Sequence, residues 1–250
     1  MHNAALASLG MRDWHYQRLP VPPALFTQTV CALAQSGFVG ANVTIPHKQA
    51  ALRLADSAST AAGAIGAANT LTLAADGTIA AENTDAPGLI DAIGEPLAGR
   101  RALVLGAGGS ARAAVWALRD AGAVEVSIYN RTRERAEALA RELGVRAVAR
   151  PQDADLLVNC TSVGLQPASD ELAQLGLSES QVGEYPLVVD LVYRAGATEL
   201  LRAAQSNGAR TLDGLEVLVA QGALSFALWT GRPAPLQVMR DAAWADPPSV

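Results

Sequence analysis

The segment from Asn42 to Lys48 carries polar side chains in a spacing that could do chemistry. It reads Asn-Val-Thr-Ile-Pro-His-Lys, so Asn42 and Thr44 occupy alternate positions of an extended run and face the same way. Pro46 is typical of a helix start, which predicts that Lys48 projects from the first turn of a helix. An ammonium there could stabilise a developing oxyanion and deliver a proton. Taken alone, a lysine in such a place is more often an exposed charge.

Two further segments concentrate polar groups where strand-like runs end. They read Gly-Ala-Ala-Asn-Thr at 66–70 and Glu-Asn-Thr-Asp-Ala-Pro-Gly at 82–88. The Asn69 amide could hydrogen-bond a hydroxyl group or serve as a turn residue. Asp85 precedes a helical stretch, which it could cap. Together with Lys48, these segments form a candidate site for proton chemistry.

A glycine-rich loop at 106–113 reads Gly-Ala-Gly-Gly-Ser-Ala-Arg-Ala, directly after the strand-like run Ala-Leu-Val-Leu and before a helical stretch. This context is typical of a dinucleotide-binding loop, whose pyrophosphate lies on the helix amino end. Gly106 would allow the tight turn, Gly108 the close backbone approach and Ala111 the packing of helix on strand. A plain glycine-rich turn is the alternative. The predicted contacts are Gly106, Ala107, Gly108, Gly109, Ser110 and Ala111.

The next strand-like run ends in Asn-Arg-Thr at 130–132, where an NAD-specific fold would place an acid against the ribose. No acid occupies that place, and Arg131 could pair with a 2′-phosphate and stack on the adenine. We therefore predict NADP, with Asn130, Arg131 and Thr132 as contacts. Arg133 and Arg135 could assist. The alternative is the solvated first turn of a helix capped by Thr132, and we assign Arg135 to that turn.

The elements that must position these residues follow two patterns. From 101 to 212, short β-branched runs alternate with helical stretches at 110–120 and 133–143, which predicts βαβ units and a parallel sheet. Residues 1–94 hold a less regular mixture that predicts a separate α/β domain. Glu95–Arg100, with its proline and glycine, is the natural linker.

The predicted fold class is therefore α/β with two domains, 1–94 and 95–216. A helical stretch at about 217–240 is expected to pack back on the first domain. Residues 241–250, with two adjacent prolines and no apolar periodicity, read as a loose tail.

The composition of the chain argues against several classes of partner. The net charge of −5 comes from dispersed acids and bases without a basic block, which argues against nucleic acid. Cys31 and Cys160 lie far apart outside any C-x-x-C spacing, so we predict neither a disulfide framework nor a metal site, and a cytoplasmic location. No apolar run is long enough to span a membrane, and the first residues do not look like a signal peptide.

The motifs together resemble the shikimate dehydrogenase family, whose substrate domain carries N-V-T-x-P-x-K, G-A-x-N-T and N-T-D-x-x-G in this order. All three are present here. The resemblance continues through the glycine loop, the Asn-Arg-Thr run and three later segments. These segments are Asn159–Gly164, Asp190–Tyr193 and Gly214–Gln221.

This resemblance implies a substrate-binding first domain and a Rossmann-like NADP-binding second domain. It also implies reversible, NADPH-dependent reduction of 3-dehydroshikimate to shikimate, with hydride transfer between C4 of the nicotinamide and C3 of the ring. Lys48 and Asp85 correspond to the family's catalytic pair. Asp85 would orient Lys48 and hold a ring hydroxyl. A homodimer is compatible with the sequence.

The remaining family contacts carry over residue by residue. For the substrate they are Thr44, Asn69, Tyr193 and Gln221. For the cofactor they add Thr161, Val192 and Gly214. Tyr193 could instead be an amphipathic core residue.

The chain departs from the family pattern in two places. It begins at Met1-His2-Asn3, where the family has a helix, and lacks the preceding strand and the H-S-x-S-P loop. Because the serine hydroxyls bind the substrate carboxylate in the family, we expect weaker anchoring of that group and a shortened form of the protein. Val217 also occupies a position where the family often has methionine, which suggests altered packing.

Three alternatives stay open. The chain could be a relative that acts on quinate, or on quinate and shikimate. It could be a truncated, catalytically weak protein that binds a dinucleotide without turnover, although retention of Lys48 and Asp85 speaks against this. It could also be an amino-acid or methylene-tetrahydrofolate dehydrogenase of similar architecture, which would not be expected to carry the whole motif set.

Overall fold

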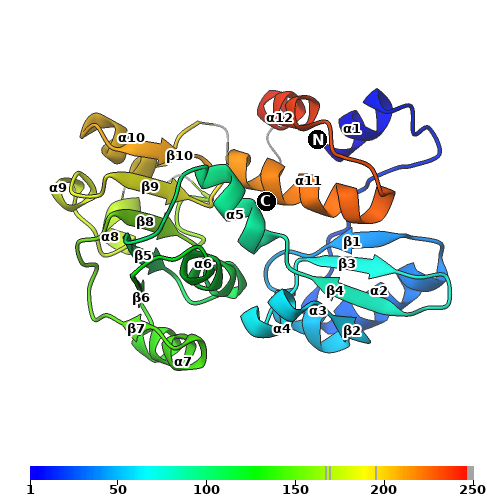
Figure 1. Ribbon diagram of the computed structural model, residues 1–250, viewed down its shortest axis with the longest axis horizontal. Helices are drawn as coiled ribbons and strands as arrows, with labels where there is room; N and C mark the ends of the chain where they lie inside the picture. The colour runs from blue at the N-terminus through cyan, green and yellow to red at the C-terminus, as the bar shows by residue number, and fades with distance from the viewer. Residues whose placement is uncertain (167, 169, 195, 247–250) are drawn as a thin grey trace.

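The structure is a computed structural model that describes residues 1–166, 168, 170–194 and 196–246. Figure 1 shows two sheets side by side, with α5 (Asp85–Ile93) and α11 (Gly214–Thr230) between them. The first sheet is formed by residues 40–82 and the second by residues 101–212. None of the described helices is long and apolar enough to cross a bilayer.

The second sheet has six strands in the order β10-β9-β8-β5-β6-β7, and all of its pairings are parallel, as predicted. β5 lies between β6 and β8, so the strand order runs in opposite directions on the two sides of β5. Ligands of such sheets bind at this switch point. The strands are β5 (Arg101–Leu105), β6 (Glu125–Tyr129), β7 (Arg146–Ala147), β8 (Leu156–Asn159), β9 (Leu187–Asp190) and β10 (Arg210–Leu212).

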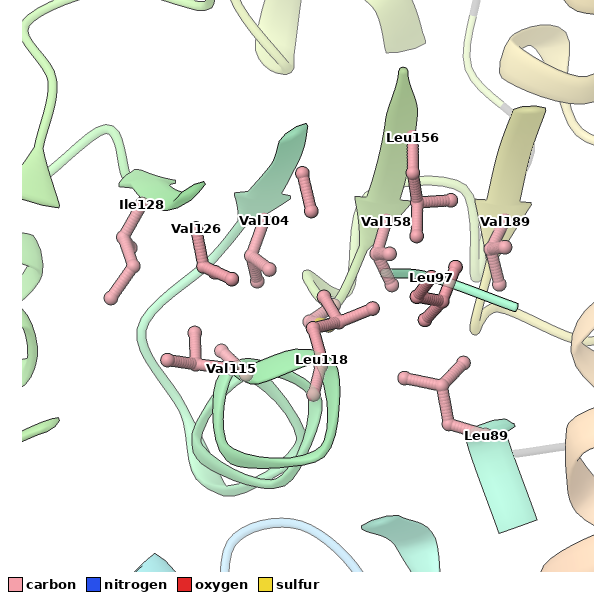
Figure 2. Packing of buried hydrophobic residues seen from close by; sticks show 14 of the residues in the cluster. Leu89, Leu97, Val104, Val115, Leu118, Val126, Ile128, Leu156, Val158 and Val189 are labelled. Carbon is pink, nitrogen blue, oxygen red and sulfur yellow. The ribbon is translucent and has the colours of Figure 1, made fainter. Parts of the chain in front are cut away.

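Helices cover both faces of this sheet, and successive side chains of each strand point to opposite faces. Ala102 and Val104 pack on one face, which α5, α6 (Gly109–Asp120) and α7 (Arg133–Leu143) cover. Figure 2 shows Val104, Val158 and Val189 facing the helix that carries Leu118. Leu103 and Leu105 face the other side. The helices that cover this second face are α8 (Glu171–Gln174), α9 (Glu179–Val182) and α10 (Glu199–Ser206).

The first sheet is smaller and mixed, with the order β1-β3-β4-β2. β3 is antiparallel to β1 and β4, and β2 is parallel to β4. One face packs on α2 (Phe26–Gln35) and α3 (Lys48–Leu54), which follow the short helix η1 (Pro23–Leu25). The strands are β1 (Gly40–Asn42), β2 (Ser57–Ala58), β3 (Thr70–Leu73) and β4 (Ile79–Glu82).

Helix α11 returns to the first sheet, where Trp229 Nε1 donates to the carbonyl oxygen of Leu71 at 3.0 Å. The helix predicted at about 217–240 is, however, two helices. Gly231 ends α11 in the left-handed conformation (φ 65°), and α12 (Leu236–Ala245) begins after Pro235. α12 packs on α11 and on α1 (His2–Ser8).

The loose tail predicted at 241–250 is also wrong in part, because residues 241–245 belong to α12. The buried positions Met239 and Ala243 are four residues apart, so the helical pattern begins before the segment that we judged aperiodic. Residues 247–250 of the predicted tail lie outside the described residues.

Candidate active site

A buried ion pair joins two of the three polar segments. Lys48 is the first residue of α3, and its ammonium donates to Asp85 Oδ2 at 2.7 Å. The side chains are 10% and 19% exposed. The carbonyl oxygen of Lys48 accepts a hydrogen bond from Ala68 N at 2.9 Å, which fixes the start of α3 beside the segment that enters β3. The structure therefore brings together the two residues predicted as a pair.

Asn69 and Gln221 complete a polar network around Asp85. Asn69 Nδ2 lies 2.8 Å from Asp85 Oδ1 and 3.1 Å from Gln221 Oε1. Thr84 N donates to Asn69 Oδ1 at 2.7 Å, which fixes the orientation of this amide. Gln221 comes from α11, which packs along α5. The network thus combines residues from three distant parts of the chain.

Two details of the helix starts differ from our predictions. Pro46 does not begin the helix. The Ile45–Pro46 peptide bond is cis, and His47 N donates to the Thr44 carbonyl oxygen in a turn before α3. Thr44 lies in this turn past the end of β1 with an exposed side chain, whereas Asn42 Nδ2 donates to Thr70 Oγ1 at 3.3 Å.

Asp85 does not cap α5. It is the first residue of that helix, and the Asn83 side chain accepts from Ala86 N at 3.1 Å in the capping role. Among the described residues, the recorded hydrogen-bond partners of the Asp85 carboxylate are side chains: Lys48 at Oδ2 and Asn69 at Oδ1.

A cavity of about 760 Å³ lies at the carboxyl ends of β5, β6 and β8. It reaches Lys48 on one side and the segment 130–132 on the other. The residues that line it and that we predicted as cofactor contacts are Gly106, Ala107, Gly108, Gly109, Ser110, Asn130, Arg131, Thr132 and Thr161. This volume is within the range of small-molecule sites.

The arginines after β6 are distributed differently from our prediction. Arg131 and Arg135 both line the cavity. Arg135 is exposed in the first turn of α7, as predicted, and it also borders the cavity. Arg131 lies before α7, and Arg135 lies in the first turn of that helix. Arg133 instead pairs with Glu137 at 2.7 Å on the exposed surface. Thr132 precedes α7, but its side chain makes no capping hydrogen bond.

The floor of the cavity explains two sequence features. Gly106 adopts φ 111°, a left-handed conformation, and a Cβ atom there would lie 3.2 Å from the backbone of Cys160. Cys160 itself lines the cavity but is buried, and this burial raises the pKa of its thiol. We did not predict Cys160 as a site residue, because a lone cysteine carries no spacing signal.

Asn159 and Asp190 organise the two loops beside this floor. Asn159 Oδ1 accepts from Thr161 N at 3.0 Å and from the Thr161 hydroxyl at 2.8 Å. Asn159 Nδ2 donates to Asp190 Oδ1 at 2.9 Å, and Val192 N donates to the same oxygen at 3.1 Å. Thr161 and Val192 are therefore held by one buried pair.

Some of the predicted contact residues do not line the cavity. Ala111 is fully buried where α6 packs on the sheet, and Val192 is buried at 3% exposure. Gly214 begins α11 against the carbonyl oxygens of Leu191 and Val192. Tyr193 packs with the side chains of α1, α11 and α12, and burial raises its pKa. For Tyr193 this placement favours the core interpretation.

Protein-family models match three stretches of the chain. The shikimate dehydrogenase substrate binding domain matches residues 1–71, shikimate / quinate 5-dehydrogenase matches 89–191, and the shikimate 5'-dehydrogenase C-terminal domain matches 214–243. A shikimate dehydrogenase (NADP(+)) from Methanopyrus kandleri is 43% identical over 260 residues, covering 97% of this chain and 88% of its own. The chain belongs to the shikimate dehydrogenase family.

Other members of the family agree in sequence and in fold. A shikimate dehydrogenase (NADP(+)) of Thermus thermophilus is 44% identical, with coverage of 97% of this chain and 91% of its own. A crystal structure of shikimate 5-dehydrogenase from another strain of Thermus thermophilus, in complex with NADP(H) and shikimate, superposes with a TM-score of 0.85 at 42% identity. The match covers 97% of this chain and 91% of that one.

The lysine content of the sequence is a further signal for the site. The chain has 19 lysine and arginine residues in total, and Lys48 is the only lysine. Arginine keeps its proton under all ordinary conditions, whereas a lysine can give one up. This chain carries arginine at its other Lys/Arg positions. It keeps an amine only at Lys48, where proton transfer is expected.

Asp190 makes the stability of this shikimate dehydrogenase family member depend on pH. Burial raises the pKa of Asp190 to about 6, although hydrogen bonds from Thr198, Val192 and Asn159 favour its charged form. The folded chain therefore holds this proton more tightly than the unfolded chain. The free energy of unfolding falls as pH rises from about 4 to about 6, by up to ~3 kcal/mol.

Asp190→Asn should remove this loss, because the amide keeps the shape of the carboxyl and has no charge to bury. The melting temperature of the variant minus that of the wild type should rise between pH 4 and pH 6, as followed by circular dichroism. Asp120→Asn, on the exposed end of α6, is the control and should give a flat difference. A flat difference for Asp190→Asn as well would contradict the titration of this residue.

Proposed function

We propose that this chain is a shikimate dehydrogenase that catalyses the reversible, NADPH-dependent reduction of 3-dehydroshikimate to shikimate. The observation that carries the proposal is the buried Lys48–Asp85 pair, which lies next to the glycine loop at one end of the cavity. The relatives that match nearly the whole chain are named for the same activity.

The residues around the cavity fit NADP. Gly108 precedes α6 without a side-chain cap among the described residues, so the first N–H groups of this helix are available to a pyrophosphate. Arg131 and Arg135 line the same cavity and would neutralise a 2′-phosphate. Among the described residues that line the cavity, no acid stands to repel that phosphate. When bound, NADPH supplies the hydride.

Lys48 is proposed as the proton donor and Asp85 as the residue that orients it. Hydride addition at C3 of the ring leaves negative charge on the ketone oxygen, and the Lys48 ammonium stabilises this charge and transfers a proton to it. The lysine is then a neutral amine, which regains a proton from solvent. In the direction of shikimate oxidation, the neutral amine accepts the proton of the C3 hydroxyl.

Asn69 and Gln221 are proposed to recognise the ring hydroxyls, together with one oxygen of Asp85. Both amides are almost completely buried. Gln221 Nε2 donates to the Leu218 carbonyl oxygen at 2.9 Å and has a second N–H for a ring hydroxyl. Asn69 already hydrogen-bonds Asp85 and Gln221, so it would exchange one of these partners for the ring. Thr44 and Tyr193 belong to the same proposal with less support, because neither side chain joins the Asp85 network among the recorded hydrogen bonds.

A homodimer and a cytoplasmic location are also part of the proposal. Cys31 and Cys160 are both free thiols, which is typical of proteins from reducing compartments. Light scattering coupled to size-exclusion chromatography would give the mass in solution. A monomer at micromolar concentration would contradict the dimer.

The function is tested by absorbance at the reduced nicotinamide band. The purified chain is given shikimate or quinate, each with NADP and separately with NAD. We expect rapid NADPH formation with shikimate and NADP, and much slower reactions in the other three combinations. Faster turnover of quinate would make the chain a quinate enzyme, and silence in all four, with NADP binding intact, would favour a binding protein.

A further inference from the structure

The glycine loop of the cofactor site makes direct contact with Lys48. The Lys48 ammonium donates not only to Asp85 but also to Ser110 Oγ, at 3.1 Å. Ser110 lies in the first turn of α6, on the side of the six-stranded sheet, whereas Lys48 begins α3 on the side of the four-stranded sheet. This hydrogen bond therefore crosses between the two halves of the molecule.

Gly109 provides a second, independent contact at the same place. A Cβ atom on Gly109 would lie 3.1 Å from Cβ and 3.1 Å from Cδ of Lys48. The lysine stem thus rests against the backbone of the loop, and a side chain at position 109 would press on this stem. Gly109 contacts the aliphatic part of the Lys48 side chain, and the Ser110 hydroxyl accepts a hydrogen bond from its ammonium.

The number of donors on the ammonium shows what this arrangement can do. A lysine ammonium carries three N–H groups. In the described part of the chain, Asp85 and Ser110 accept two of these hydrogen bonds, so one N–H is left for a substrate oxygen. The two acceptors come from different elements, and together they fix the direction of the third N–H.

We propose that Ser110 is a positioning residue for Lys48, and that its hydroxyl, rather than serving the cofactor alone, directs the proton of the ammonium toward the substrate. The inference rests on the proposed function and adds a residue to it. The geometry that carries it is the 3.1 Å hydrogen bond from the Lys48 ammonium to Ser110 Oγ, beside the contact of the lysine stem with Gly109.

The test uses the fact that Lys48 is the only lysine in the sequence. Protein labelled with lysine that carries ¹³C at Cε gives one resonance, whose chemical shift reports the protonation of Lys48 directly and without turnover. The pH titration is recorded for the wild type, Ser110→Ala, Ser110→Thr and Asp85→Asn. Ser180→Ala, an exposed serine on α9, is the matched control.

We expect the titration midpoint to move to lower pH in Ser110→Ala, because a hydrogen bond to the charged form is lost. Asp85→Asn should move it further, since a full charge is removed. Ser110→Thr should restore the wild-type midpoint, and Ser180→Ala should not change it. The kcat for shikimate oxidation should fall roughly 3–10-fold in Ser110→Ala, with the affinity for NADP within about twofold.

A wild-type midpoint in Ser110→Ala would overturn the proposal, above all if NADP affinity falls instead, because Ser110 would then be a cofactor contact only. The NMR titration also distinguishes failure of the Ser110 proposal from failure of the proposed function. If the wild type does not oxidise shikimate, the function is wrong, but the shift of the midpoint still decides whether Ser110 acts on Lys48.

Discussion

Lys48→Ala is expected to lower the kcat for shikimate oxidation by about 10²–10⁴-fold while NADP affinity stays close to that of the wild type. The variant lacks the group that accepts and returns the substrate proton, and no other lysine exists in the chain to replace it. Initial rates at the reduced nicotinamide band measure the first effect. Quenching of protein fluorescence by NADPH measures the second.

Lys48→Arg is the matched control for charge. A guanidinium keeps the positive charge beside Asp85 but does not release a proton at ordinary pH. If Lys48 acts by proton transfer, Lys48→Arg should be nearly as slow as Lys48→Ala. Near-wild-type rates in the arginine variant would show that charge alone is needed, and unchanged rates in the alanine variant would remove Lys48 from the mechanism.

Arg131→Ala is expected to weaken NADPH binding by roughly 10–100-fold and NADH binding by much less, since a charge-assisted pair with the 2′-phosphate contributes about 1.5–3 kcal/mol. Arg131 lines the cavity at the end of β6, where an NAD-specific fold would carry an acid. Titration of intrinsic fluorescence with each cofactor gives both constants.

Arg133→Ala is the control for this prediction, because Arg133 pairs with Glu137 on the surface and does not line the cavity. It removes the same charge two residues away and should leave the ratio of the two affinities unchanged. Equal losses for NADPH and NADH in Arg131→Ala would defeat the assignment of the 2′-phosphate to this arginine.

The parts of this fold that follow from local pattern could be predicted. The strand-like runs alternate with helical stretches from 101 onward, and the parallel sheet follows because each βαβ unit is decided by neighbouring residues. The glycine loop was recognisable for the same reason, since its turn, its helix start and its preceding strand lie within a dozen residues. Lys48, Asp85 and Asn69 were recognisable because their motifs occur together in one family.

The parts that depend on packing between distant elements could not be predicted. Ser110 was assigned to the cofactor from its loop, and its contact with Lys48 exists only because α3 and α6 meet across the two sheets. Arg135 reaches the cavity through the direction in which α7 leaves β6. The second half of α12 was predicted as a tail, because the buried positions of this helix are few and two adjacent prolines follow it in the sequence, which favour a loop by local criteria.

The most direct test of the proposed activity follows the hydrogen at C3 of the substrate. Shikimate carrying deuterium at C3 is incubated with this chain and NADP, and the reduced cofactor is isolated and weighed by mass spectrometry. The account predicts reduced cofactor that is one mass unit heavier, formed only in the presence of the chain. Unlabelled reduced cofactor would mean that the hydride comes from another position, and the absence of any reduced cofactor would mean that this chain does not oxidise shikimate.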